Sequence, residues 1–161
     1  MTFCNSVMMD RLIKGIGLIC LLILVACEKA QDEQVNVSVF RQVPSTESGF
    51  DFFNAVENQK EINIFKYRNF YNGGGAAIGD INNDGLPDIY MSGNMSANKL
   101  YLNKGNLKFE DISQQAGVEG SKPWSTGVAM VDINQDGHLD IYVSNAGNLE
   151  GDNQDNDLYI N

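Results

Sequence analysis

Short apolar runs, separated by polar and glycine-rich stretches, make up the chain from residue 75 onward. β-branched and aromatic residues gather at 89–91 and 141–143, and each of these runs follows a small apolar run, at 75–79 and 127–131. Further runs lie at 100–102 and 107–112. Short runs bounded by Gly and Asn are typical of β-strands, and no segment keeps a helical period. For residues 61–71 the pattern does not distinguish a strand from a short helix.

An internal repeat organises these runs. Residues 80–92 read DINNDGLPDIYMS and residues 132–144 read DINQDGHLDIYVS, with nine of thirteen positions identical at an offset of 52. NKLYLN at 98–103 matches NDLYIN at 156–161 at an offset of 58. Units of this length with four short strands are typical of β-propeller blades. The sequence therefore predicts an all-β chain that forms a partial propeller of about two blades, the second incomplete.

Both repeats contain an acidic loop, at 80–88 and at 132–140, whose oxygen-bearing residues alternate. Side chains at loop positions 1, 3, 5 and 9 and the backbone carbonyl at position 7 can converge on one ion, while Gly at position 6 permits a sharp turn. Each loop holds three carboxylates, which repel one another unless a cation neutralises them. Oxygen ligands select Ca²⁺ over zinc or copper, so we expect two Ca²⁺ sites. The expected ligands are Asp80, Asn82, Asp84, Leu86 and Asp88 in the first loop and Asp132, Asn134, Asp136, His138 and Asp140 in the second.

Three other interpretations of the loops are less favoured. A solvated turn explains one Asn-Asp-Gly loop, but less readily two in equivalent places. An EF-hand or dockerin loop requires an acidic residue at position 12, where this chain has Met91 and Val143. A catalytic carboxylate pair requires a nucleophile or base, and none accompanies these acids. His138 stands where the backbone alone is needed, so we expect a solvated imidazole, and we expect Trp124 to pack between blades.

GDINNDGLPDIYMSGN and VDINQDGHLDIYVSN resemble the FG-GAP or VCBS-type repeats that form propeller blades in integrin alpha subunits and many bacterial surface proteins. The wider stretch from 47 to 161 resembles a bacterial lipoprotein branch that often carries a C-terminal ASPIC/UnbV domain, which this sequence lacks. The resemblance implies a propeller of about seven or eight blades, with Ca²⁺ in the loop that joins the first two strands of a blade. Because the second unit lacks its last strand, we expect this chain to be a fragment of a longer propeller.

The N-terminus has the pattern of a secreted protein. Arg11 and Lys14 precede an uncharged apolar run at 15–26, which is too short to cross a bilayer. The run ends in LVAC, which resembles the lipobox of bacterial lipoproteins and predicts that Cys27 becomes the lipidated mature N-terminus. We therefore expect a protein of the bacterial cell envelope, anchored through Cys27 to a membrane, most simply the outer membrane.

Three segments follow from these patterns. They are a lipoprotein signal peptide at 1–26, a tether at 27–48 with a short strand at 35–40, and the repeat region at 49–161.

Composition narrows the classes of function. Asp plus Glu number 21 against 11 Lys plus Arg, a net charge of -10, so nucleic acid and anionic lipid surfaces are poor partners for the protein. The sequence shows no Cys/His, Ser/His/Asp or Lys/Tyr constellation, so we expect no enzyme. The leading hypothesis is a calcium-binding, lipid-anchored propeller segment that binds a protein or glycan outside the cell or in the periplasm. An accessory or scaffold subunit of an outer-membrane nutrient-uptake system is the alternative, and a propeller-borne polysaccharide-active enzyme is less favoured.

Overall fold

The computed structural model describes residues 38–122, 124–146 and 155–161. The chain divides into two compact units, Met1–Arg41 and Gln42–Asn161. The predicted signal peptide, Cys27 and the first half of the tether, up to residue 37, lie outside the described residues. The described part of the strand expected at 35–40, residues 38–40, is not a strand. Among the described residues, no helix has the length and apolar character needed to cross a membrane.

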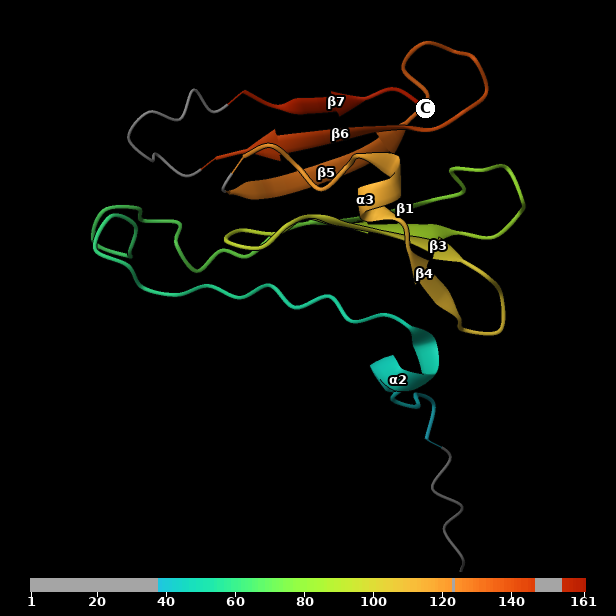
Figure 1. The fold of residues 1–161 in the computed structure, drawn as a ribbon, viewed down its shortest axis with the longest axis horizontal. Helices are drawn as coiled ribbons and strands as arrows, with labels where there is room; N and C mark the ends of the chain where they lie inside the picture. The colour runs from blue at the N-terminus through green and yellow to red at the C-terminus, as the bar shows by residue number, and fades with distance from the viewer. Residues whose placement is uncertain (1–37, 123, 147–154) are drawn as a thin grey trace, which may run out of the picture. The chain divides into compact units, whose positions relative to one another are not determined.

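Two antiparallel sheets form the second unit (Figure 1). The first contains β1 (Ala76–Gly79), β2 (Asp88–Met91), β3 (Lys99–Asn103) and β4 (Phe109–Asp111), paired in chain order. The second contains β5 (Ser125–Val131), β6 (Asp140–Asn145) and β7 (Asp157–Tyr159), also in chain order. The described helices are single turns, α2 (Ser45–Ser48) and α3 (Ser113–Ala116). The predicted all-β fold of blade-like sheets is confirmed.

The strand pairing repeats with the offsets seen in the sequence. Ile78 is paired with Ile89 between β1 and β2, and Met130 with Ile141 between β5 and β6, 52 residues later. Ile89 is paired with Tyr101 between β2 and β3, and Ile141 with Tyr159 between β6 and β7. The third strand of the second sheet therefore lies 58 residues after its counterpart in the first sheet, six more than the 52 that separate the earlier strands, as in the sequence match.

The structure corrects two details of the expected elements. The strand expected at 107–112 begins only at Phe109, because Asn106 and Leu107 have positive φ values of 52° and 59° and form a turn. Residues 61–71 form neither a strand nor a helix but a series of turns. The side chain of Asn63 contributes to this, since its carbonyl oxygen accepts hydrogen bonds from the backbone N–H groups of Phe65 and Lys66.

The two sheets share one hydrophobic core. Its buried members come from both sheets and from the segment after α3: Tyr90, Leu100, Val118, Ile141 and Val143. β1 packs against β5, and glycine permits this close approach. A Cβ atom on Gly79 would lie 2.6 Å from Leu139 Cδ1, and one on Gly75 would lie 2.7 Å from the carbonyl oxygen of Thr126. The first strands of the two repeats are therefore held side by side.

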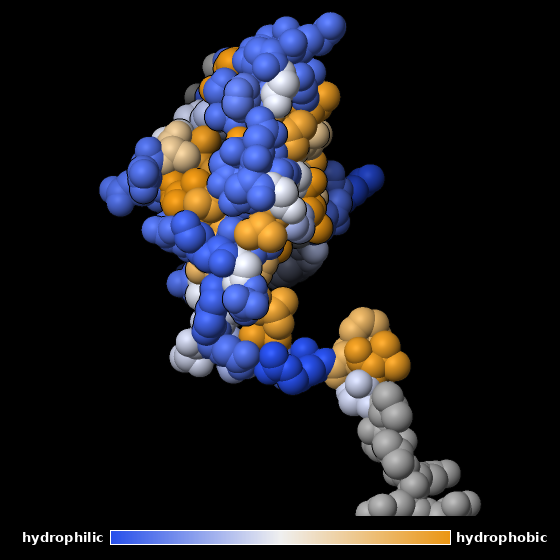
Figure 2. All heavy atoms as spheres, turned by 90° about the vertical axis from the view of Figure 1, so that its right-hand side faces the viewer, coloured by the Kyte–Doolittle hydropathy of each residue, from blue (hydrophilic) through white to orange (hydrophobic). Residues whose placement is uncertain are grey.

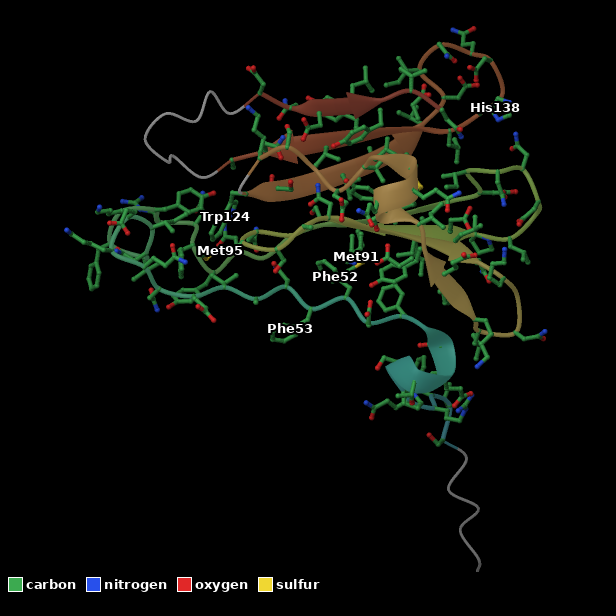
Figure 3. The ribbon with its side chains drawn as sticks, in the orientation of Figure 1. Phe52, Phe53, Met91, Met95, Trp124 and His138 are labelled. Atoms are coloured by element: carbon green, nitrogen blue, oxygen red, sulfur yellow. The ribbon has the colours of Figure 1, made fainter. Side chains whose placement is uncertain are left out.

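Trp124 is expected to pack between blades; it is a packing residue, but its aromatic partners come from the segment before β1. Its side chain is 1% exposed and belongs to a second cluster with Ile62 and Phe70. Its ring lies 5.2 Å from that of Tyr67 and 5.4 Å from that of Phe70, and Met95 lies beside this cluster (Figure 3). These aromatic partners come from the turn-rich segment before β1, so Trp124 attaches that segment to the sheets.

Candidate metal centre

The two acidic loops join the first two strands of each sheet, as predicted. Residues 80–88 connect β1 to β2, residues 132–140 connect β5 to β6, and both loops lie at the same end of the sheets (Figure 1). The glycine at loop position 6 has φ 85° in Gly85 and 91° in Gly137, a conformation that side chains disfavour. Hydrophilic residues cover the middle of this end, with apolar residues to either side (Figure 2).

Loop positions 1, 3 and 5 are arranged alike in the two repeats. The backbone N–H of Asp84 donates both to Asp80 Oδ1 and to Asn82 Oδ1, each at 3.1 Å. The N–H of Gly85 donates to Asp80 Oδ2 at 2.7 Å, and that of Leu86 to Asp84 Oδ1 at 2.8 Å. Asn82 Nδ2 lies 2.9 Å from Asp84 Oδ2. All five hydrogen bonds recur in the second loop, on Asp132, Asn134, Asp136, Gly137 and His138, at 2.8–3.1 Å.

These bonds turn the oxygen-bearing side chains of each loop toward one another. Asp80 and Asn82 both bind the same amide, so their Oδ1 atoms lie close together, and Asp84 is bonded to Asn82. A carboxylate has about four lone-pair sites and uses at most two here, so acceptor capacity remains. Among the described residues, no three His, Cys, Asp or Glu side chains are already gathered as a complete ligand group.

The aspartate at position 9 is used differently from the others. Asp88 and Asp140 are each 0% exposed. The Asp88 carboxylate accepts the N–H of Ile81 at 3.0 Å and that of Asn103, at the end of β3, at 2.7 Å. Asp140 does the same for Ile133 at 2.9 Å and Asn161 at 3.0 Å. This aspartate ties its loop to the third strand of the sheet, a role that the sequence pattern did not suggest.

No lysine or arginine in the described part of the chain forms an ion pair with the loop aspartates. The described ion pairs lie along β3 and β4, where Lys99 binds Asp111 and Lys104 lies 3.6 Å from Glu110. The His138 N–H, and then the Asn134 amide, lower the pKa of Asp136 below its ordinary value, so this carboxylate is charged at neutral pH. The donor set is therefore anionic, rich in oxygen and without a cationic side chain, which fits Ca²⁺.

Position 7 carries different side chains in the two loops. Leu86 is half-buried and lies over Gly105, whereas His138 is exposed, as expected (Figure 3). The imidazole is not merely solvated, however, because Asn83 of the first loop lies 3.2 Å from His138 Nδ1. No sequence pattern predicts this contact, which joins residues far apart in the chain.

Two blade-like antiparallel sheets with matching acidic loops define the class of repeat in this chain. Residues 80–143 match the FG-GAP-like repeat family, and this stretch contains both loops. The chain therefore contains an FG-GAP-like repeat. Membership of the bacterial lipoprotein branch that often carries an ASPIC/UnbV domain stays a prediction.

Among curated proteins the chain is similar to cartilage acidic protein 1. It is 40% identical to the Xenopus tropicalis protein over 78 residues, which are 48% of this chain and 12% of that protein. It is 36% identical to the mouse protein over 73 residues and to the human protein over 76 residues, covering 45% and 47% of this chain. The matched stretches span 11–12% of these relatives, so the chain corresponds to a small part of their length.

Proposed function

We propose that this chain is a calcium-binding segment of a propeller that serves binding or adhesion at the cell envelope. The observation that supports the proposal best is the identical hydrogen bonding of the two loops. Twice in one chain, the side chains at positions 1, 3 and 5 are turned toward one another, with no lysine or arginine from the described residues to neutralise them.

The residues that would hold the ions are those of the two loops. Asp80, Asn82 and Asp84, with the carbonyl of Leu86, would supply oxygen ligands in the first loop, and Asp132, Asn134, Asp136 and the His138 carbonyl in the second. Asp88 and Asp140 retain lone pairs beyond their backbone bonds. Bound Ca²⁺ would neutralise the carboxylates. The loop residues themselves fix the β1–β2 and β5–β6 connections and place their exposed side chains at one end of the sheets.

Calcium titration of the purified full-length protein tests the proposal. Extracellular modules bind Ca²⁺ with Kd of about 10⁻⁴–10⁻³ M, and saturation at about 100 times Kd stabilises a protein by about 2.7 kcal/mol per site. Asp84→Ala and Asp136→Ala should each remove one binding event seen by calorimetry. Glu57→Ala is the matched control, since it removes an exposed carboxylate outside the loops. Unchanged calcium uptake in both loop variants would show that the loops are turns and nothing more.

Attachment through Cys27 is a separate part of the proposal, and it rests on the sequence pattern alone. Mass spectrometry of the N-terminal peptide should show an acyl group on Cys27, and Cys27→Ser should release the protein from the membrane fraction. A cleaved chain with a free Cys27 thiol would refute anchoring while leaving the calcium proposal intact.

The binding role would be tested on envelope fractions, because the partner is a protein or glycan still to be identified. A glycan array and a pull-down with and without a calcium chelator would reveal a calcium-dependent partner. Co-purification with an outer-membrane uptake complex instead would favour the accessory-subunit alternative.

A further inference from the structure

One side chain connects the two acidic loops directly. Asn83, at position 4 of the first loop, donates from Nδ2 to the carbonyl oxygen of Gly137 at 3.1 Å. The same Nδ2 atom lies 3.2 Å from His138 Nδ1, so the neutral imidazole can accept a hydrogen bond there. Gly137 and His138 are positions 6 and 7 of the second loop. The first repeat thus binds the turn of the second repeat at its tip.

The peptide that Asn83 binds is central to the second loop. The Gly137–His138 peptide accepts from Asn83 through its carbonyl and donates through the His138 N–H to Asp136 Oδ1 at 2.9 Å. Both polar groups of one peptide are therefore fixed, one by each repeat. In the first loop, the N–H of the equivalent Gly85–Leu86 peptide binds Asp84 at 2.8 Å. Among the described residues, no side chain binds the carbonyl of that peptide.

The backbone at position 4 directs this side chain. Asn83 has φ 59° and its equivalent, Gln135, has φ 63°, so both residues lie in the left-handed region that Asn tolerates better than most. Gln135 is exposed and makes no side-chain hydrogen bond within the described residues. A return contact reinforces the connection, since Asn161 Nδ2 at the end of the second repeat donates to the carbonyl of Ile81 at 2.6 Å. The two repeats are thus joined in both directions.

We propose that Asn83 is a positioning residue for the neighbouring loop, which couples cation binding at the second loop to the structure of the first. By fixing the Gly137–His138 peptide, Asn83 holds the His138 N–H that donates to Asp136. The same contact fixes the backbone that leads to the His138 carbonyl, the expected ligand at position 7. The coupling rests on the proposed calcium function, but the Asn83 contact itself does not need an ion. Asn83 supplies no ligand to either loop.

Asn83→Gly in the full-length protein is the most direct test, because glycine accepts φ 59° without strain and only the side chain is lost. Gln135→Gly is the matched control, with the same deletion at an equivalent φ. Asn83→Gln should keep much of the native Ca²⁺ affinity that Asn83→Gly loses, since it retains an amide donor and Gln already adopts this conformation at position 135. Loss of one hydrogen bond predicts about 2- to 10-fold weaker Ca²⁺ binding at the second loop.

Two measurements separate coupling from a local effect. In the Asp136→Ala background, where the second loop cannot hold its ion, Asn83→Gly should no longer change Ca²⁺ affinity. A change that persists there would place the effect in the first loop and overturn the proposal. Without metal, NMR of ¹⁵N-labelled histidine should show a shifted Nδ1 resonance of His138, the single histidine of the sequence, in Asn83→Gly but not in Gln135→Gly.

Calcium binding by the native protein separates a missing coupling from a missing calcium site. If the native protein binds Ca²⁺ at both loops and Asn83→Gly binds it equally well, only the coupling is refuted. If the native protein binds no Ca²⁺, the proposed function fails and the coupling with it. An unchanged His138 resonance in metal-free Asn83→Gly would show that Asn83 does not contact His138 in solution, and the coupling would then have no structural basis.

Discussion

Replacing the buried aspartate at loop position 9 should destabilise the fold even when no ion is present. Asp88→Ala removes the acceptor of two backbone N–H groups, those of Ile81 and Asn103, from a site that is 0% exposed. Hydrogen bonds to a charged group contribute about 1.5–3 kcal/mol each, and removing the buried charge recovers part of its desolvation cost. We therefore expect a loss of about 2–4 kcal/mol in the free energy of unfolding.

Asp84→Ala is the matched comparison, because its carboxylate is exposed and its amide partner can bind water instead. We expect its cost without calcium to stay within about 1 kcal/mol. Urea unfolding with a chelator measures both variants, and at about 2 kcal/mol per molar urea the Asp88→Ala midpoint should fall by roughly 1–2 M. Hydrogen exchange at the Ile81 and Asn103 amides reports the same event locally.

Equal stability of Asp88→Ala and Asp84→Ala in chelator, or unchanged exchange at the two amides, would show that the Asp88 carboxylate does not hold its loop to β3. Asp140→Ala offers an internal repetition, since Asp140 binds Ile133 and Asn161 in the same way. A large effect at one position 9 and none at the other would contradict the equivalence of the two repeats.

Three further changes test the packing and the charges outside the loops. Trp124→Ala should cost about 3–5 kcal/mol of stability in a denaturation curve, whereas Phe65→Ala, at a ring 96% exposed, should change it by less than about 0.5 kcal/mol. Gly74→Ala should destabilise by about 1–3 kcal/mol in the same assay, because its Cβ would lie 1.9 Å from a backbone carbonyl oxygen at the end of β2, and an unchanged midpoint would contradict this. Burial alone would raise the pKa of Asp111, but hydrogen bonds from its lysine and serine partners outweigh burial and lower the pKa below its ordinary value. The ionised Asp111 carboxylate therefore stabilises the fold at neutral pH, and this contribution is lost as the pH falls below about 4. Asp111→Asn should remove this part of the pH dependence, by at most about 1 kcal/mol for so exposed a pair, and a native-like acid dependence in the variant would disprove the assignment.

The strands and their register could be predicted because the repeat carries them. Ile89 and Ile141 lie in β-branched and aromatic runs after closely similar acidic loops, and local pattern alone predicts a strand there. The offset rises from 52 to 58 between the two sequence matches, and the register of β7 against β6 shows the same six extra residues. Elements defined by short-range pattern and by repetition were therefore accessible from the sequence.

Contacts made by the segment before β1 could not be predicted in the same way. Asn54 Nδ2 binds Asn94 Oδ1 at 2.7 Å, and Asn94 in turn binds the carbonyls of Gly73 and Ser125. These polar side chains look like ordinary loop residues in the sequence, yet Asn94 is almost fully buried. Their burial follows from how distant segments pack, and the Asn83–Gly137 contact escaped prediction for the same reason.

The two loops also show which of their positions determine geometry. Position 7 is Leu86 in one loop and His138 in the other, yet both N–H groups donate to the aspartate at position 5, at 2.8 Å and 2.9 Å. The side chain at this position therefore does not shape the turn, since an aliphatic and an imidazole group leave the same backbone bonds in place. Because it is free of that task, it can serve contacts outside its own loop: Leu86 lies over Gly105 within its sheet, and His138 meets Asn83 of the neighbouring repeat. The aspartates thus set a common loop in both repeats, and the residue at position 7 decides what that loop touches.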